Sequence, residues 1–196
     1  MRKMKYLLAV VLFAFCGTGA SAQDWKSILS DVAKRVVGDK TTTAASIVGT
    51  WSYVAPDCEF ESDNLLAKAG GDVATAKIKQ QLGNVYKKIG LTSVTYTFNS
   101  DGTYSSKFGK ASTSGTYTFD ADKKTVTMKT RLGFSQTAYV TVVDSKMNLL
   151  FDADKLMTVL KSVTAFTAKL NTNAALINTL VSNYDGLRLG FELKKN

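Results

Sequence analysis

The residues of this chain that could carry out chemistry are few, and most of them are carboxylates. The sequence has no histidine among its 196 residues. Serine–histidine and cysteine–histidine nucleophile pairs are therefore excluded, and so are histidine-ligated zinc and haem sites. Gly70-Gly71 lacks the Gly-Lys-Ser/Thr that completes a phosphate-binding loop. What remains for an enzyme is a pair of acids.

Two pairs of acids lie close together in the sequence, Asp120/Asp122 and Asp152/Asp154. Each flanks a predicted turn or helix start, where Asp is common because its side chain hydrogen-bonds to nearby backbone. A glycosidase needs two acids about 5–9 Å apart across one cleft, a separation that sequence spacing does not establish. We therefore expect a protein that is not an enzyme and that needs no cofactor.

A further group of acids occupies every second position in Asp57, Glu59, Glu61 and Asp63. In an extended conformation these four carboxylates share one face. Calcium would need six or more oxygens, generally from a folded loop. We expect a solvated strand edge instead, whose charges also discourage aggregation.

The N-terminus predicts where the protein works. Basic residues at positions 2, 3 and 5 precede an apolar run over 6–15, and small residues follow to position 22. This is the layout of a secretory signal peptide over residues 1–22, with cleavage between Ala22 and Gln23. The apolar run is about half the length that spans a bilayer, so we expect no transmembrane segment in the mature chain. We expect export, either to the periplasm or out of the cell.

The mature chain would keep 22 basic and 16 acidic residues, a formal charge of +6. Its basic residues occur singly or in pairs such as Lys87-Lys88, which does not indicate a nucleic-acid-binding tail. Cys16 would leave with the signal peptide, so Cys58 could form no internal disulfide. Without a histidine to activate it, we expect Cys58 to be a buried structural thiol. A chain of this length can rely on its hydrophobic core.

The periodicity of the apolar residues predicts a mainly β domain with helical additions. A short amphipathic helix at 24–37 and a linker make up residues 23–46, and the domain itself covers 47–196. Helical insertions are expected at 65–89, with a break at Gly70-Gly71, and at 153–184, as a helical hairpin. Period-two alternation and turn residues predict eight strands, the first of them ending at Pro56. The predicted strands are 47–55, 93–99, 102–108, 114–119, 124–130, 134–143, 146–151 and 187–193.

Eight antiparallel strands can close into a barrel that holds one small ligand. Gly49-Thr50-Trp51 is similar to the Gly-x-Trp signature of lipocalins, whose Trp plugs the closed end of the barrel. The whole mature chain also resembles a family of secreted, lipocalin-like proteins from Gram-negative bacteria, a family without an established function. The matching segments are residues 47–53 (IVGTWSY), 58–66 (CEFESDNLL), 98–104 (FNSDGTY), 115–117 (GTY) and 190–195 (GFELKK).

The resemblance implies an eight-stranded antiparallel lipocalin-like barrel and a barrel-closing motif of Gly49, Trp51 and an Arg that packs across the Trp. Arg188 is the candidate, with Arg131 as the alternative, through a cation–π contact. Lipocalins have no helical insertion between their first two strands. The insertion at 65–89 would either cover the mouth of the barrel or fill it.

Two functions remain open. The first is binding of a small apolar or amphipathic ligand inside the barrel, contacted by six inward aromatic residues. These are Tyr53, Tyr96, Phe98, Tyr104, Tyr117 and Phe119. The second is an interaction or structural role at the cell envelope, in which the helical insertions bind a partner protein and no small ligand is involved.

Overall fold

The computed structural model of the chain describes residues 42–155 and 184–196. The predicted signal peptide (1–22) and N-terminal helix (24–37) lie outside the described residues. The same holds for most of the predicted helical hairpin, of which only 153–155, which are helical, and Tyr184 are described.

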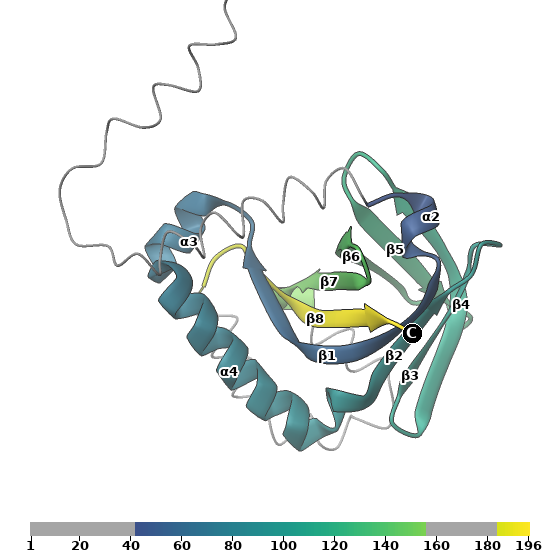
Figure 1. Cartoon of the computed structure of the whole chain (residues 1–196), viewed down its shortest axis with the longest axis horizontal. Helices are drawn as coiled ribbons and strands as arrows, with labels where there is room; N and C mark the ends of the chain where they lie inside the picture. Colours follow the sequence, from purple (N-terminus) through teal and green to yellow (C-terminus); the bar gives the residue numbers. More distant parts are fainter. Residues whose placement is uncertain (1–41, 156–183) are drawn as a thin grey trace, which may run out of the picture. The chain divides into compact units, whose positions relative to one another are not determined.

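The strands form a closed antiparallel barrel in which each strand pairs with its neighbours in sequence and β1 pairs with β8 (Figure 1). This confirms the predicted fold class. The strands are β1 (Gly49–Phe60), β2 (Val94–Phe98), β3 (Thr103–Phe108), β4 (Ala111–Asp120), β5 (Thr125–Thr130), β6 (Ser135–Val143), β7 (Lys146–Asp152) and β8 (Leu187–Lys195).

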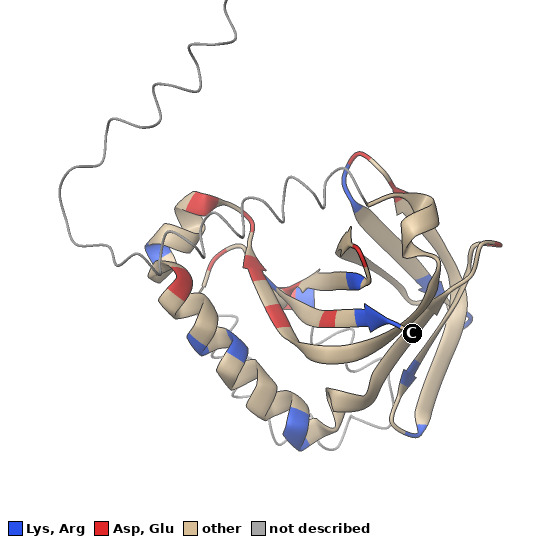
Figure 2. Cartoon of the chain, in the orientation of Figure 1, with Lys and Arg blue, Asp and Glu red and all other residues tan. Residues whose placement is uncertain are grey.

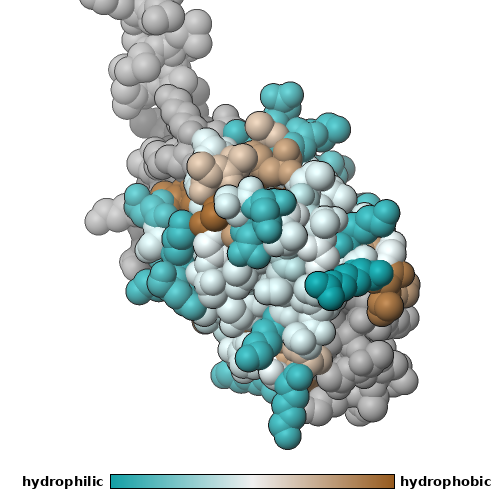
Figure 3. All heavy atoms as spheres, turned by 90° about the vertical axis from the view of Figure 1, so that its right-hand side faces the viewer, coloured by the Kyte–Doolittle hydropathy of each residue, from teal (hydrophilic) through white to brown (hydrophobic). Residues whose placement is uncertain are grey.

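Alternation along the strands places apolar side chains in the core of the barrel. In β2, Val94, Tyr96 and Phe98 are buried, while Thr95 and Thr97 are half-buried. β3 and β6 alternate in the same way, because successive side chains of a strand point to opposite faces. Figure 3 shows the side of the barrel on which β3 and β4 lie, and there the apolar residues form small, separate groups.

β1 does not end at Pro56, and that prediction was wrong. The strand continues to Phe60 and pairs with β8 over most of its length, with an irregularity between Tyr53 and Ala55. Its pairing with β2 covers only Gly49 to Ser52. Beyond Ser52 one edge of β1 therefore has no neighbouring strand, and a proline, which lacks the N–H, is tolerated at such an edge.

The insertion between β1 and β2 forms two helices, α3 (Asp63–Ala69) and α4 (Gly71–Ile89). They meet at Gly70, whose φ of 103° is the left-handed conformation that glycine adopts readily. This confirms the predicted break. Gly90, with a φ of 83°, ends α4 where the sequence indicated.

α4 runs along β1 and completes the core (Figure 1). One face of the helix is buried and joins the same hydrophobic cluster as the inward residues of the barrel. The residues of this face are Ala74, Ile78, Leu82, Val85, Tyr86 and Ile89. The helix packs on the stretch of β1 that β2 leaves unpaired, where Gly83 lies against the ring of Pro56. The insertion is thus part of the wall of the core.

A short helix, α2 (Ala44–Ile47), covers the end of the segment predicted to be a linker and Ile47, the predicted first residue of the first strand, which instead begins at Gly49. Thr43 caps it, because its hydroxyl accepts a hydrogen bond from the backbone N–H of Ser46 and the Ser46 hydroxyl accepts one from the backbone N–H of Thr43. The hydroxyl of Thr42 accepts a hydrogen bond from the backbone N–H of Val142 in β6. Residues 42–47 therefore link β1 to β6 across one end of the barrel.

Candidate functional site

The barrel interior brings together four of the six aromatic residues that the sequence singled out. The rings of Tyr96 and Phe98 stack with centroids 6.1 Å apart, and Phe98 lies 6.4 Å from Tyr104 and 5.1 Å from Tyr117. Tyr96, Phe98 and Tyr104 are at most 2 % exposed. These distances are typical of packed aromatic pairs.

The hydroxyl groups of Tyr96 and Tyr104 are buried and have no hydrogen-bond partner among residues 42–155 and 184–196. Burial raises the pKa of both phenols, and the proximity of Tyr104 raises the pKa of Tyr96 further. Both groups therefore stay protonated and can donate a hydrogen bond. A buried polar group without a partner costs about 1–3 kcal/mol, so this pair needs an explanation beyond folding.

Three of the six predicted residues, Tyr53, Tyr117 and Phe119, are only partly buried and lie at the margins of this cluster. Tyr53 is half-buried and packs against Tyr86 of α4 and Phe191 of β8. Tyr117 donates its hydroxyl proton to the carbonyl of Asn99 at 2.8 Å, so its polar atom is already satisfied. Phe119 is half-buried and packs against the core.

Three aromatic residues of the interior were missed by the sequence reading. Phe108 and Phe191 have ring centroids 5.8 and 6.3 Å from that of Tyr96. Tyr86 lies 5.2 Å from Phe191 and donates its hydroxyl proton to the carbonyl of Gly190 at 3.2 Å. The alternation of Tyr104, Ser106 and Phe108 in β3 was a signal that could have identified Phe108.

Gly49 and Trp51 form a barrel-closing motif with Lys195. Trp51 is fully buried, and its indole N–H donates to the carbonyl of Ile47 in α2 at 2.8 Å. The ammonium group of Lys195 lies 5.2 Å from the centroid of the Trp51 ring, within cation–π range. A Cβ atom at Gly49 would come within 2.6 Å of the Lys195 side chain, and the φ of Gly49 is 136°.

The expected contact between Arg188 and Trp51 is therefore wrong. Register decides this, because Trp51 lies opposite Lys195 whereas Arg188 lies opposite Glu59, near the other end of β1. The guanidinium of Arg188 instead lies 3.5 Å from the centroid of the Tyr139 ring. The alternative residue, Arg131, is exposed in the turn between β5 and β6.

Asp57 is 5 % exposed, so the predicted solvated row of acids is wrong at this position. Its carboxylate accepts a hydrogen bond from Asn148 of β7 at 2.7 Å and pairs with Lys79 of α4 at 2.6 Å. Asp57 lies opposite Gly190, so no side chain of β8 stands between Asp57 and β7. Burial raises the pKa of Asp57, and Lys79 opposes that effect.

Cys58 is buried, as expected, and its thiol lies 3.7 Å from the carbonyl of Thr75 in α4. Burial raises the pKa of this thiol to about 12. The thiolate form is therefore scarce at neutral pH, which does not suit a reactive cysteine.

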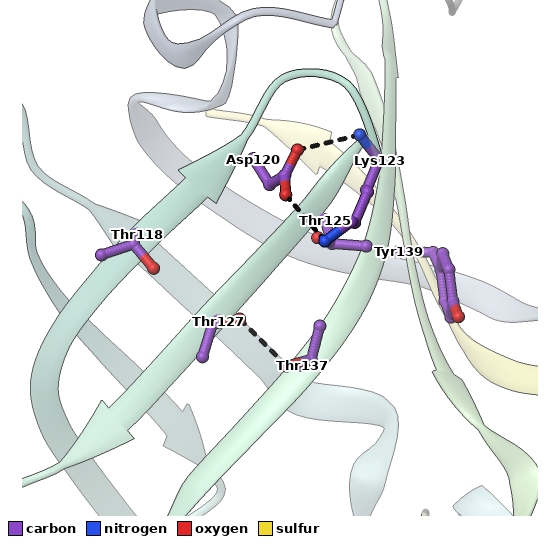
Figure 4. A pocket seen from close by; sticks show the side chains of 7 residues that line it. All are labelled: Thr118, Asp120, Lys123, Thr125, Thr127, Thr137 and Tyr139. Atoms are coloured by element: carbon purple, nitrogen blue, oxygen red, sulfur yellow. Dashed lines mark hydrogen bonds and ion pairs between the residues drawn. The ribbon is translucent and has the colours of Figure 1, made fainter.

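A groove of about 580 Å³ lies on the outer face of β4, β5 and β6 (Figure 4). Its floor consists of two rows that cross the three strands, Thr118–Thr127–Thr137 and Asp120–Thr125–Tyr139. The hydroxyls of Thr127 and Thr137 bond to each other at 2.9 Å. The carboxylate of Asp120 accepts hydrogen bonds from the backbone N–H groups of Asp122 and Lys123, and it thereby stabilises the turn between β4 and β5.

A second hollow, of about 390 Å³, lies beside Tyr139 and Arg188 at the ends of β7 and β8. Asp152 and Asp154, one of the predicted acid pairs, line it. Asp152 pairs with Lys155 at 2.8 Å and with Arg188 at 4.0 Å. Among residues 42–155 and 184–196, no group of three acid or thiol side chains is arranged to hold a metal ion. Within the same ranges, no helix is long and apolar enough to cross a membrane.

The match to a protein family agrees with the observed fold. Residues 24–195 match the family described as Lipocalin-like domain (DUF4923). The chain is also similar to a crystal structure of a DUF4847 family protein from Bacteroides vulgatus, with 13% sequence identity and a TM-score of 0.36. That similarity covers 76% of this chain and 94% of the other. No curated protein sequence matches the chain.

The family match covers nearly all of the chain and includes the Gly-x-Trp segment at the closed end of the barrel. The resemblance to lipocalin-like proteins that the sequence indicated is thereby confirmed. The chain belongs to the DUF4923 family of lipocalin-like domains.

Proposed function

We propose that the protein is an exported, non-enzymatic binding protein that holds a small amphipathic ligand in its barrel, against the hydroxyls of Tyr96 and Tyr104. The observation that carries this proposal is the pair of buried hydroxyls without partners. A ligand with a hydrogen-bond acceptor would satisfy both groups, and the surrounding rings of Phe98, Phe108 and Phe191 would contact its apolar part.

The acceptor of this ligand is a neutral group such as a carbonyl or an ether. A carboxylate buried beside Tyr96 would need a cation nearby. The rings around Tyr96 are those of Phe98, Phe108 and Phe191, which carry no charge. The ligand enters between β1 and β2, where only four residue pairs, from Gly49 to Ser52 on β1, join the two strands. α4 covers the rest of this gap, so entry requires α4 to move.

The alternative, an envelope interaction protein that acts through its helical insertions, gains no support from residues 65–89. The apolar face of α4 is buried in the core, and Val73 is the large apolar residue that this insertion exposes within the described chain. A face for a partner protein would expose several apolar residues together.

The test is native mass spectrometry of the protein purified from the envelope fraction of the cells that produce it. We expect a co-purified small molecule that is lost in the Tyr96→Phe/Tyr104→Phe double variant. Tyr139→Phe is the matched control, because Tyr139 lies on the outer face of the barrel. A ligand-free wild-type mass, together with unchanged Trp51 fluorescence on addition of a panel of lipids, would refute the proposal.

A further inference from the structure

The turn between β5 and β6 exposes two large apolar side chains close together. Leu132 is 83% exposed and Phe134 is 57% exposed. The other large apolar side chains that are exposed in the described ranges, Val54 and Val73, lie in β1 and α4. Apolar surface left in water contributes nothing to folding, so two such residues in one turn indicate a binding role.

The turn is held in place by its backbone and not by these two side chains. The backbone N–H of Thr130 donates to the carbonyl of Phe134 at 2.8 Å, and the N–H of Gly133 donates to the carbonyl of Thr130 at 2.9 Å. The hydroxyl of Thr130 accepts from the N–H of Phe134 at 3.1 Å, and the N–H of Arg131 donates to the carbonyl of Ser114 in β4 at 3.1 Å. Leu132 and Phe134 are therefore presented on a fixed hairpin and can be replaced without loss of the turn.

Positive charge surrounds this hairpin. Lys129 and Arg131 are exposed beside it, and Lys107 and Lys110 are exposed on the neighbouring β3–β4 hairpin. The two hairpins lie at the same end of the barrel, because consecutive strands are antiparallel. Basic residues, drawn in blue, mark the β3–β4 hairpin in Figure 2. The acids between Val94 and Lys146 are Asp101, Asp120, Asp122 and Asp144. Asp120 is the last residue of β4 and the other three lie in turns, all at the opposite end, because an antiparallel barrel alternates its turns between two ends.

Four acids, Glu61, Asp152, Asp154 and Asp185, line the hollow beside Tyr139 of β6, the strand that follows the hairpin. Asp152 is paired with Lys155 and Arg188. Asp154 lines the hollow beside Arg188. These acids therefore belong to the neighbouring hollow, and the exposed side of the β5–β6 hairpin keeps its positive charge.

We propose that this surface, formed by Lys107, Lys110, Lys129, Arg131, Leu132 and Phe134, docks the protein on a lipid bilayer that contains anionic lipids. Leu132 and Phe134 insert at the level of the headgroups, where apolar and aromatic side chains are stable. The four cations face the anionic headgroups, and each adds attraction within a screening length of the surface. The positive charge of this surface complements the negative charge of the headgroups, which favours such a bilayer over an uncharged apolar partner.

The test is the partition of the whole chain onto vesicles of phosphatidylglycerol mixed with phosphatidylcholine, compared with vesicles of phosphatidylcholine alone. We expect partition to the anionic vesicles to be about tenfold stronger, and most of this difference to be lost near ~1 M salt, where the screening length is about 3 Å. Every variant carries the same N-terminal segment, so the contribution of that segment cancels in the comparison.

Matched variants assign the effect to the hairpin. Leu132→Ser/Phe134→Ser and Lys129→Gln/Arg131→Gln should each lower partition to the anionic vesicles about tenfold. Val73→Ser, at an 80% exposed site on α4, and Lys123→Gln/Lys124→Gln, at the other end of the barrel, should leave it unchanged. Equal partition to both kinds of vesicle, or an equal loss in the control variants, would overturn the proposal.

Discussion

Two neighbouring parts of the barrel bury aromatic side chains that carry an N–H or O–H group. The two parts differ in whether that group has a hydrogen-bond partner. Trp51 of β1 and Tyr96 of β2 lie directly opposite each other, and both are fully buried. The indole N–H of Trp51 has a partner in α2, and the hydroxyl of Tyr86 has one in β8. The hydroxyls of Tyr96 and Tyr104 have no partner in the part of the chain that the structure describes.

The bonded polar atoms of Trp51 and Tyr86 stabilise the fold, whereas the hydroxyls of Tyr96 and Tyr104 are the groups that we propose bind a ligand. At the closed end and beneath α4, Trp51 and Tyr86 each also link one element to another through a hydrogen bond. On β2 and β3, the rings of Tyr96 and Tyr104 pack in the core, while their buried hydroxyls lower the free energy of unfolding.

The largest effect is expected for Trp51→Ala. The change leaves a cavity in the core and removes the hydrogen bond to α2, so the free energy of unfolding should fall by about 4 kcal/mol. Urea unfolding measures this value. Val73→Ala, at an exposed site, is the control and should stay within about 0.5 kcal/mol of wild type. A loss below about 1 kcal/mol would mean that the closed end does not hold the fold together.

Gly49→Ala tests the same end through the backbone. The φ of Gly49 is unfavourable for alanine, and the new Cβ would press against Lys195. We expect the free energy of unfolding to fall by about 2 kcal/mol. In the Lys195→Ala background the contact is gone and only the backbone strain remains, so the cost of Gly49→Ala should be smaller there. An equal cost in both backgrounds would show that Lys195 does not pack on Gly49.

Tyr86→Phe and Tyr96→Phe form a matched pair with opposite expected signs. Removal of the bonded Tyr86 hydroxyl should lower the free energy of unfolding by about 1 kcal/mol. Removal of the Tyr96 hydroxyl from ligand-free protein should raise it by about 1 kcal/mol, because a buried group without a partner is eliminated. Thermal and urea unfolding of the two variants give both values. A loss of stability in Tyr96→Phe would show that this hydroxyl is bonded even without a ligand.

Local patterns in the sequence were enough to predict the eight strands and the break between α3 and α4, because alternation and turn residues are properties of neighbouring positions. Pro56 misled the reading of β1, since the absence of a second neighbouring strand is a property of the barrel. The identity of the cation near Trp51 depends on the β1–β8 register, which pairs residues more than 100 positions apart. No local pattern in the sequence specifies that register.

For the candidate site, too, the sequence predicted what depends on neighbouring positions and not what depends on distant ones. Alternation identified Tyr96, Phe98 and Tyr104 as inward residues, and the structure buries all three. Whether a buried hydroxyl finds a partner depends on elements that are distant in sequence, as the bond from Tyr86 to Gly190 shows. The burial of Asp57 escaped the sequence reading for the same reason, because α4 and β7 supply its partners.

The smallest effect concerns Asp57, which ties α4 to β1 and β7. Burial raises its pKa in the folded protein, with Lys79 opposing, so the folded state binds the proton more tightly than the unfolded chain. The stability that this adds is present in full below the unfolded pKa of about 4 and is lost as the pH rises through the folded pKa. Asp57→Asn stays neutral, so the stability of wild type relative to this variant should fall as the pH rises.

Urea unfolding of both proteins from about pH 4 upward measures this difference. Lys79→Gln provides the control, because without the opposing ammonium the pKa of Asp57 rises further and the decline should extend to higher pH. If wild type instead gains stability over Asp57→Asn as the pH rises, the ion pair outweighs burial. In that case α4 is held most firmly when Asp57 is ionised, and the gap between β1 and β2 is best closed at neutral pH.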